Sequence, residues 1–116
     1  MLGIIPRPVH GVIDYLWSTA FSSAPEWFGF ARDARARLFC RAMGGGAMSM
    51  SLFTRYEMGV VKVIPFNIHL AGDVLSVVAG FAGLALTKQN SKARNAILGF
   101  TVLEIGALIL SKRDPQ

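Results

Sequence analysis

Two stretches of the chain contain almost no ionisable side chains. Between Pro65 and Thr87 the only such residues are His69 and Asp73. Between Ala93 and Leu110, leaving aside one arginine at the edge, there is only Glu104. A bilayer hydrocarbon core about 30 Å thick is crossed by roughly 20 helical residues. The pattern therefore predicts a transmembrane helix over each of these stretches.

Two further apolar stretches carry more charge but are long enough for the same role. They run from Pro8 to Phe30 and from Leu38 to Val61. Their ionisable side chains are His10, Asp14, Glu26, Arg41, Arg55 and Glu57. A soluble helical bundle is the alternative, but its helices would show a polar stripe, and Val74 to Thr87 shows almost none. We therefore predict an all-α membrane protein with four transmembrane helices.

The composition agrees with lipid as the main solvent. The chain has 116 residues, which predicts one domain over 1–116. Charged residues make up only 16% of it, against about 25% in soluble domains. The net charge of +5 is spread beside the apolar stretches, which suits phospholipid headgroups and not nucleic acid. The single Cys40 excludes an intramolecular disulfide.

The chain also contains an internal repeat at an offset of 59 residues. Without gaps, this offset pairs Ile5-Pro6 with Ile64-Pro65, His10 with His69, Asp14 with Asp73, Leu16 with Leu75, Ala20 with Ala79, and Ala34-Arg35 with Ala93-Arg94. Repeat unit 1 is then 1–59 and unit 2 is 60–116. Each unit is expected to form one helical hairpin. An even number of spans per unit makes the two units parallel, related by an axis along the membrane normal.

One segment carries a resemblance to a known family. Unit 1 contains Ser23-Ala24-Pro25-Glu26-Trp27-Phe28-Gly29-Phe30, and in this respect the chain resembles the SPW-repeat family of small bacterial membrane proteins. It departs from the Ser-Pro-Trp motif by Ala24 before the proline and Glu26 after it. Unit 2 has Gly83-Leu84-Ala85 there instead. The resemblance implies a four-span membrane protein and implies no activity.

The repeated His-x-x-x-Asp pattern is the strongest candidate site. Residues four apart lie on one helix face, so Asp14 can orient His10, and Asp73 can orient His69. Three interpretations stay open. The pairs are structural and fix how the helices dock, or the two histidines ligate a haem or a chlorophyll-type pigment. The third is a metal or proton site formed by His10, Asp14, Glu57, His69 and Asp73.

Glu104 is the deepest acidic residue, and a charge at that depth costs several kcal/mol unless it is paired or protonated. We expect an ion pair with Arg41, at equivalent depth on the second helix. The alternative is a protonated carboxyl hydrogen-bonded to Ser49 or Thr101. The ungapped repeat gives Gly45 as the counterpart of Glu104.

Small residues predict close helix packing, because they let helix backbones approach one another. They are Gly44, Gly45 and Gly46 in the second helix and Ala79, Gly80 and Gly83 in the third.

No motif for catalysis is present. The sequence has no Gly-rich phosphate loop, nucleophile elbow, paired CxxC or zinc-ligand spacing. We predict a non-enzymatic protein of the bacterial inner membrane, in contact with lipids and with other membrane subunits. Its expected role is an accessory or scaffold subunit of a larger complex, such as an energy-transducing one. The alternatives are a haem or pigment protein using His10 and His69, and a small proton or metal transporter using Asp14, Asp73 and Glu104.

Overall fold

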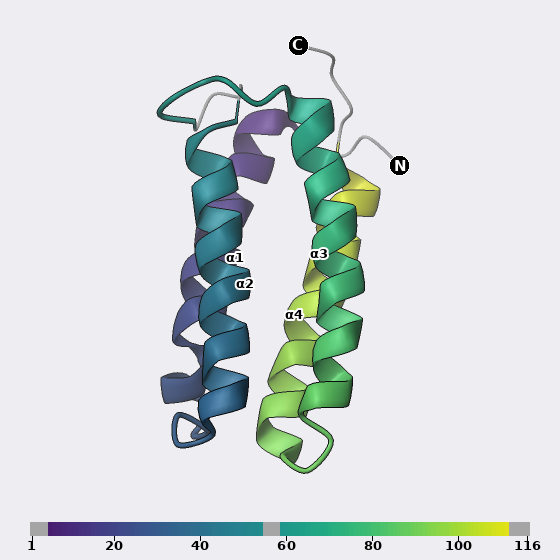
Figure 1. Ribbon diagram of the computed structural model, residues 1–116. Helices are drawn as coiled ribbons and strands as arrows, with labels where there is room; N and C mark the ends of the chain where they lie inside the picture. The colour runs from purple at the N-terminus through teal and green to yellow at the C-terminus, as the bar shows by residue number, and fades with distance from the viewer. Residues whose placement is uncertain (1–4, 55–58, 112–116) are drawn as a thin grey trace.

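A computed structural model describes residues 5–54 and 59–111 and consists of four helices (Figure 1). They are α1 (Arg7–Trp27), α2 (Ala34–Leu52), α3 (Phe66–Leu86) and α4 (Ser91–Leu110). No strand occurs in these described residues, apart from two isolated bridge pairs. The all-α expectation, with four helices, is confirmed.

The helices form an up-down-up-down bundle (Figure 1). The pairs α1·α2 and α3·α4 pack against each other far more extensively than the two hairpins pack together, which they do through α1·α4 and α2·α3. Helices α1 and α3 therefore lie on one diagonal of the bundle, and α2 and α4 on the other. The bundle measures 42 × 27 × 19 Å.

Two of the four described helices, α3 and α4, are long and apolar enough to cross a membrane. Only 22% of the apolar window of each is buried inside the bundle. Large apolar side chains such as Leu75, Val78 and Val102 instead point outward. Helices α1 and α2 fall short of this test, so a membrane role of all four helices stays a prediction.

The helix boundaries differ from the expected spans because of local capping. Asp33 accepts a hydrogen bond from the Ala36 N–H at 3.1 Å, so α2 begins before Leu38. Asn90 accepts from the Ala93 N–H at 3.2 Å in the same way and starts α4. The Asn90 side-chain amide also donates to Asp33 at 3.0 Å, which joins the two turns.

The hydrogen bonds to Asp33 also lower the pKa of its carboxyl group. Hydrogen bonds from the Ala36 N–H and then from Asn90 hold the pKa of the Asp33 carboxyl below its ordinary value. The carboxylate therefore stays charged where it caps α2.

The expected second span to Val61 is too long, because α2 ends at Leu52. The N–H groups of Val60 and Val61 donate to the Leu52 carbonyl, and the Ile64 N–H donates to the Phe53 carbonyl at 2.7 Å. The chain thus folds back over the end of α2 and occupies the carbonyls that end the helix.

The repeat is visible in the structure, but the ungapped offset holds only for the first helix of each unit. The turn between α1 and α2 covers residues 28–33 and that between α3 and α4 covers 87–90, so unit 2 is two residues shorter there. The second helices therefore correspond at an offset of 57. This pairs Ala36 with Ala93, both fully buried, and corrects the pairing of Ala34-Arg35 with Ala93-Arg94.

Close packing involves some of the predicted small residues and not others. A Cβ at Gly44 would lie 2.5 Å from the Ser18 carbonyl oxygen and 2.6 Å from the Ser22 nitrogen, both on the α1 backbone. A Cβ at Gly46, as at Gly45, would meet nothing within 4 Å. The α1·α2 crossing therefore depends on Gly44. In α3, Gly80 leaves room for Thr101, and Gly83 leaves room for Phe39.

We expect Gly44→Ala to lower the free energy of unfolding by about 1–3 kcal/mol, because the new methyl group meets backbone that cannot yield without separating α1 from α2. Gly46→Ala is the matched control. It should be neutral or gain up to about 1 kcal/mol from better helix propensity. Thermal unfolding in detergent measures both. Equal stability of the two variants would contradict the assigned crossing.

Candidate metal centre

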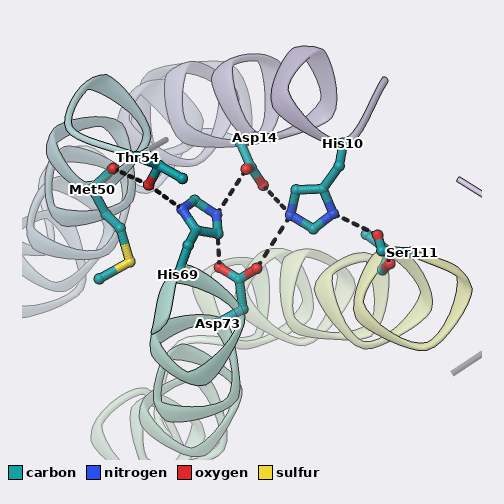
Figure 2. Close-up of polar contacts among 8 residues, drawn as sticks. His10, Asp14, Met50, Thr54, His69, Asp73 and Ser111 are labelled. Atoms are coloured by element: carbon teal, nitrogen blue, oxygen red, sulfur yellow. Dashed lines mark hydrogen bonds and ion pairs between the residues drawn. The ribbon is translucent and has the colours of Figure 1, made fainter. Parts of the chain in front are cut away.

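His10 and Asp14 on α1 face His69 and Asp73 on α3 across the long axis of the bundle (Figure 2). On the same helix, His10 Nε2 lies 3.2 Å from Asp14 Oδ1, and His69 Nε2 lies 3.5 Å from Asp73 Oδ1. Between helices, His10 Nε2 lies 3.3 Å from Asp73 Oδ2, and His69 Nε2 lies 2.9 Å from Asp14 Oδ2. Each carboxylate therefore bridges both imidazoles. We call these four residues the His–Asp ring.

Local helix geometry and the repeat together produce this arrangement. The i,i+4 spacing places each aspartate one turn from its own histidine on the same face. Because α1 and α3 run in the same direction, the two pairs meet at the same depth, near the end of the bundle where both helices begin (Figure 1). Glu57, the fifth predicted metal ligand, lies outside the described residues.

The ring is shielded from its surroundings. His10 and His69 are each 1% exposed, and both aspartates are largely covered. Phe66, which is fully buried, packs edge-on against His10 at 5.3 Å between ring centroids, and nearly parallel to His69 at 5.9 Å. Interactions between charges are strong in such a site, and an unpaired charge there is costly.

A hydroxyl group fixes the proton on the far nitrogen of each histidine. His69 Nδ1 lies 2.7 Å from Thr54 Oγ1, whose own proton goes to the Met50 carbonyl at 2.6 Å (Figure 2). A hydroxyl carries one hydrogen, so Thr54 must accept from His69 Nδ1–H. The second histidine has the same surroundings: Ser111 donates to the Ala107 carbonyl and accepts from His10 Nδ1–H.

The sequence analysis did not identify Thr54 and Ser111 as site residues, because the ungapped offset of 59 does not align them with each other. At the corrected offset of 57 they are counterparts, each just after the second helix of its unit. Backbone contacts hold them in place through the repeated Ile-Pro entries. Ile5 forms a bridge pair with Ser111, and Ile64 forms one with Thr54.

With Nδ1 protonated, the Nε2 atom of a neutral imidazole presents a lone pair to the two carboxylates. Lone pairs and carboxylates repel unless a cation lies between them, either protons on Nε2 or a metal ion. For His10, neither carboxylate contact has the angular geometry of an N–H···O hydrogen bond. One ligand atom from each of the four residues can be chosen so that all lie within 4.8 Å of one another.

The spacing of these atoms suits a small metal ion. Tetrahedral zinc bonded to nitrogen and oxygen at about 2.0–2.1 Å has ligand atoms about 3.3 Å apart. The four nitrogen–oxygen contacts of the His–Asp ring, at 2.9, 3.2, 3.3 and 3.5 Å, are close to that value, but each aspartate uses a different oxygen toward each histidine. With one ligand atom from each residue, the four atoms lie within 4.8 Å of one another, so the side chains would have to draw together around an ion.

The predicted Glu104–Arg41 ion pair is wrong. Arg41 forms a bidentate ion pair with Glu26, at 2.7 and 2.8 Å, on the outer surface of the first hairpin. It cannot reach Glu104, because α2 and α4 lie on a diagonal and Arg41 faces away from the centre. The structural counterpart of Glu104 is Ala47, not Gly45, because of the two-residue difference between the turns.

The two hydroxyl groups expected as alternative partners of Glu104 donate to backbone carbonyls of their own helices instead. Ser49 donates to the Gly45 carbonyl at 2.9 Å, and Thr101 donates to the Ile97 carbonyl at 2.8 Å. Glu104 is buried, at 8% exposure, and its Oε1 atom has no hydrogen-bond partner within the part of the chain that the structure describes.

A groove between α2 and α3 borders one residue of the His–Asp ring. It has a volume of about 270 Å³. Its lining includes Met43, Gly46, Met50, Gly72, Asp73 and Ser76. Asp73 thus belongs both to the ring and to the wall of the groove.

No protein-family model, no curated protein and no solved structure matches this chain. The resemblance to the SPW-repeat family therefore stays a prediction.

Proposed function

We propose that this protein is a four-span integral membrane protein that binds one divalent transition-metal ion between its two hairpins. The ligands are His10, Asp14, His69 and Asp73. The observation that carries the proposal is the commitment of both Nδ1 protons to hydroxyl groups, which turns both Nε2 lone pairs toward the two carboxylates. Metal-binding histidines normally donate the proton of the other ring nitrogen in this way.

The chemistry of the ligands favours zinc or a similar ion. Imidazole nitrogens suit zinc, cobalt, nickel and iron, whereas magnesium and calcium prefer oxygen alone. Two carboxylates balance the charge of a divalent ion inside a nearly dry site. Four protein ligands complete a tetrahedral shell and leave no open position, which is typical of structural and not catalytic zinc.

The effect of the ion would be to fasten the two hairpins together. One hairpin supplies two ligands through α1 and the other supplies two through α3, while the direct packing between hairpins is sparse. An ion that binds only the assembled bundle stabilises it in proportion to its occupancy. The protein would then be rigid when loaded and looser when empty.

The arrangement favours a small ion over a haem or a pigment. The imidazole rings of His10 and His69 have centroids 5.6 Å apart, and both carboxylates contact the facing Nε2 atoms. A macrocycle between the rings would have to displace both carboxylates. An accessory role beside a larger complex of the bacterial inner membrane stays a prediction.

Helix length supports a full span by each helix. The shortest helix, α2, has 19 residues, which at about 1.5 Å each approach the roughly 30 Å of the hydrocarbon core. The exposed apolar side chains of α3 and α4 would meet lipid directly.

We expect zinc to stabilise the detergent-purified protein, by about 2.7 kcal/mol when free zinc is about 100 times its dissociation constant. Asp73→Asn should abolish this gain, because it removes one charged ligand at nearly constant volume. Glu26→Gln, which alters a carboxylate outside the ring, should keep it. The measurement is the unfolding midpoint with zinc and with a chelator, together with the metal content after dialysis.

Two results would contradict metal binding. One is a protein that retains no stoichiometric metal after dialysis against zinc and shows no zinc-dependent midpoint. The other is an equal zinc effect in the wild type and in Asp73→Asn, which would place the ion elsewhere. Cobalt gives a second measurement, since a tetrahedral site with these ligands gives visible absorption bands that Asp73→Asn should lose.

Zinc binding should weaken as the pH falls from about 7.5 to about 5.5, because protons compete for the Nε2 lone pairs and for the carboxylates. A zinc titration at each pH measures this. An affinity that does not change over that range would argue that the histidines are not ligands.

The membrane assignment has its own test. Alkaline carbonate washing should leave the protein in the membrane pellet, and only detergent should release it, because the exposed apolar surface of α3 and α4 would be buried in lipid. A peripheral protein carried on the same membranes serves as the control. Recovery in the carbonate supernatant would overturn the four-span proposal.

A further inference from the structure

A long groove lies along the outer face of α4. Its larger part has a volume of about 790 Å³ and is lined by α4 residues from Lys92 to Leu103, with Phe28, directly after α1, at one side. A second part of about 540 Å³, between α1 and α4, shares three lining residues with the first and continues toward Leu110. We call the larger part the α4 groove.

The α4 groove is polar at one end only. Lys92 and Asn95 line the end near the turns, whereas residues such as Leu98, Gly99 and Leu103 line the rest. From Lys92 to Leu103 a helix rises about 16 Å, which is close to half of the roughly 30 Å hydrocarbon core, or one leaflet. The groove therefore has the polarity and the length of one phospholipid, with a place for a headgroup and a channel for an acyl chain.

The corresponding seam between α2 and α3 shows why this groove is open. There the Phe39 ring of α2 packs against α3, where Gly83 leaves room for it. The counterpart of Phe39 at the offset of 57 is Ala96, which lines the α4 groove. A Cβ at Gly99 would also meet nothing within 4 Å. One seam is therefore filled by an aromatic ring of the protein itself, and the other is left open by small residues.

Lys92 brings an unpaired positive charge to the end of the groove. Its ammonium nitrogen lies 3.7 Å from the position that a Cβ would take at Gly29, so the side chain extends from α4 toward the turn after α1. Within residues 5–54 and 59–111, this ammonium group has no ion-pair partner. An anionic group bound at this end would supply one, and a phosphate oxygen accepts strongly from a lysine.

The surroundings of Lys92 carry an excess of positive charge. The α1–α2 and α3–α4 turns lie at the same end of the bundle (Figure 1). With the first residues of α2 and α4, they contain one acidic residue, Asp33, and six basic ones, which are Arg32, Arg35, Arg37, Lys88, Lys92 and Arg94. Both Asp33 oxygens already accept hydrogen bonds, from Ala36 and Asn90. This end of the molecule therefore favours an anionic headgroup over a zwitterionic one.

We propose that the α4 groove binds one anionic phospholipid, with its phosphate at Lys92 and an acyl chain lying past Gly99 toward Leu103. The proposal rests on the four-span assignment and is independent of metal binding. A phospholipid is the occupant that fits both observations, because it joins an anionic group to an apolar chain of one leaflet's length. It would complete the seam that Phe39 closes on the other side of the bundle.

The headgroup contact is tested with lipid retained by the purified protein. The protein is incubated in mixed micelles with equal amounts of phosphatidylglycerol and phosphatidylcholine, and bound lipid is counted by native mass spectrometry. We expect one phosphatidylglycerol per chain in the wild type. Lys92→Gln should lower its affinity about fivefold, because one basic residue at the phosphate is lost. Arg94→Gln is the matched control, since Arg94 lies near the same turn but does not line the groove, and it should bind as the wild type does.

A second pair of variants tests the acyl chain. Gly99→Leu places a branched side chain in the groove and should lower phosphatidylglycerol retention severalfold, because the side chain and the acyl chain cannot occupy the same space. Gly45→Leu adds the same side chain on α2, where a Cβ also meets nothing within 4 Å, and should bind as the wild type does. All four substituted positions are exposed. The unfolding midpoint verifies that each variant is folded.

Equal loss of phosphatidylglycerol in Lys92→Gln and Arg94→Gln would overturn the site and leave a general attraction to the basic turns. Equal retention of the two lipids, wild-type binding by Gly99→Leu, or a wild type that retains no lipid would also overturn it. So would a second protein that occupies the groove, recovered with the wild type and lost from Gly99→Leu. Because the carbonate wash and the zinc titration are read separately, a protein that passes both and retains no lipid contradicts this site alone.

Discussion

The charge balance of four buried side chains is the constraint on which the contact between α1 and α3 depends, because two carboxylates facing two imidazole nitrogens need protons or a metal ion between them. Each carboxylate of the His–Asp ring contacts an imidazole on its own helix and one on the other. Without those contacts, burial of either carboxylate would cost several kcal/mol. The ring therefore requires both hairpins at the same depth, and a slip of α1 against α3 by one turn would separate every pair. The register of the hairpins is also fixed by apolar packing, since Phe21 of α1 stacks on Phe100 of α4 at 4.6 Å and the Trp17 indole donates to the Phe100 carbonyl at 2.8 Å.

The sequence predicts the part of this site that depends on helix periodicity. Four-residue spacing fixes each His and Asp on one face, and an even number of helices per repeat fixes the direction of α1 and α3. Together they bring His10 and His69 to one level without any knowledge of packing. The spacing could not show that each aspartate would bridge to the other helix, because that depends on how far apart the helices pack and on which of them are diagonal.

The errors come from turns and from the order of helices around the bundle. Two residues missing between α3 and α4 shift the second helices, so that Thr54 and Ser111 were not recognised as counterparts. The caps Asp33 and Asn90 are the side chains that mark this deletion, since both accept from the N–H three residues on, but the ungapped offset pairs Asp33 with Lys92. The expected Glu104–Arg41 pair failed for another reason. Equal depth does not bring two side chains together when their helices are diagonal and one of them faces outward.

The two repeats agree inside the bundle and differ outside it. The inner residues must match, because the His–Asp ring, its two hydroxyl groups and the backbone bridges from Ile5 and Ile64 each need a counterpart from the other unit. The outer residues have no such requirement and respond to whatever covers them. Ala85 and Leu98 are apolar and exposed, whereas their counterparts Glu26 and Arg41 are charged and pair with each other. Comparison of the two units therefore separates the residues that join the hairpins, which correspond in both units, from the outward-facing residues, which differ between them.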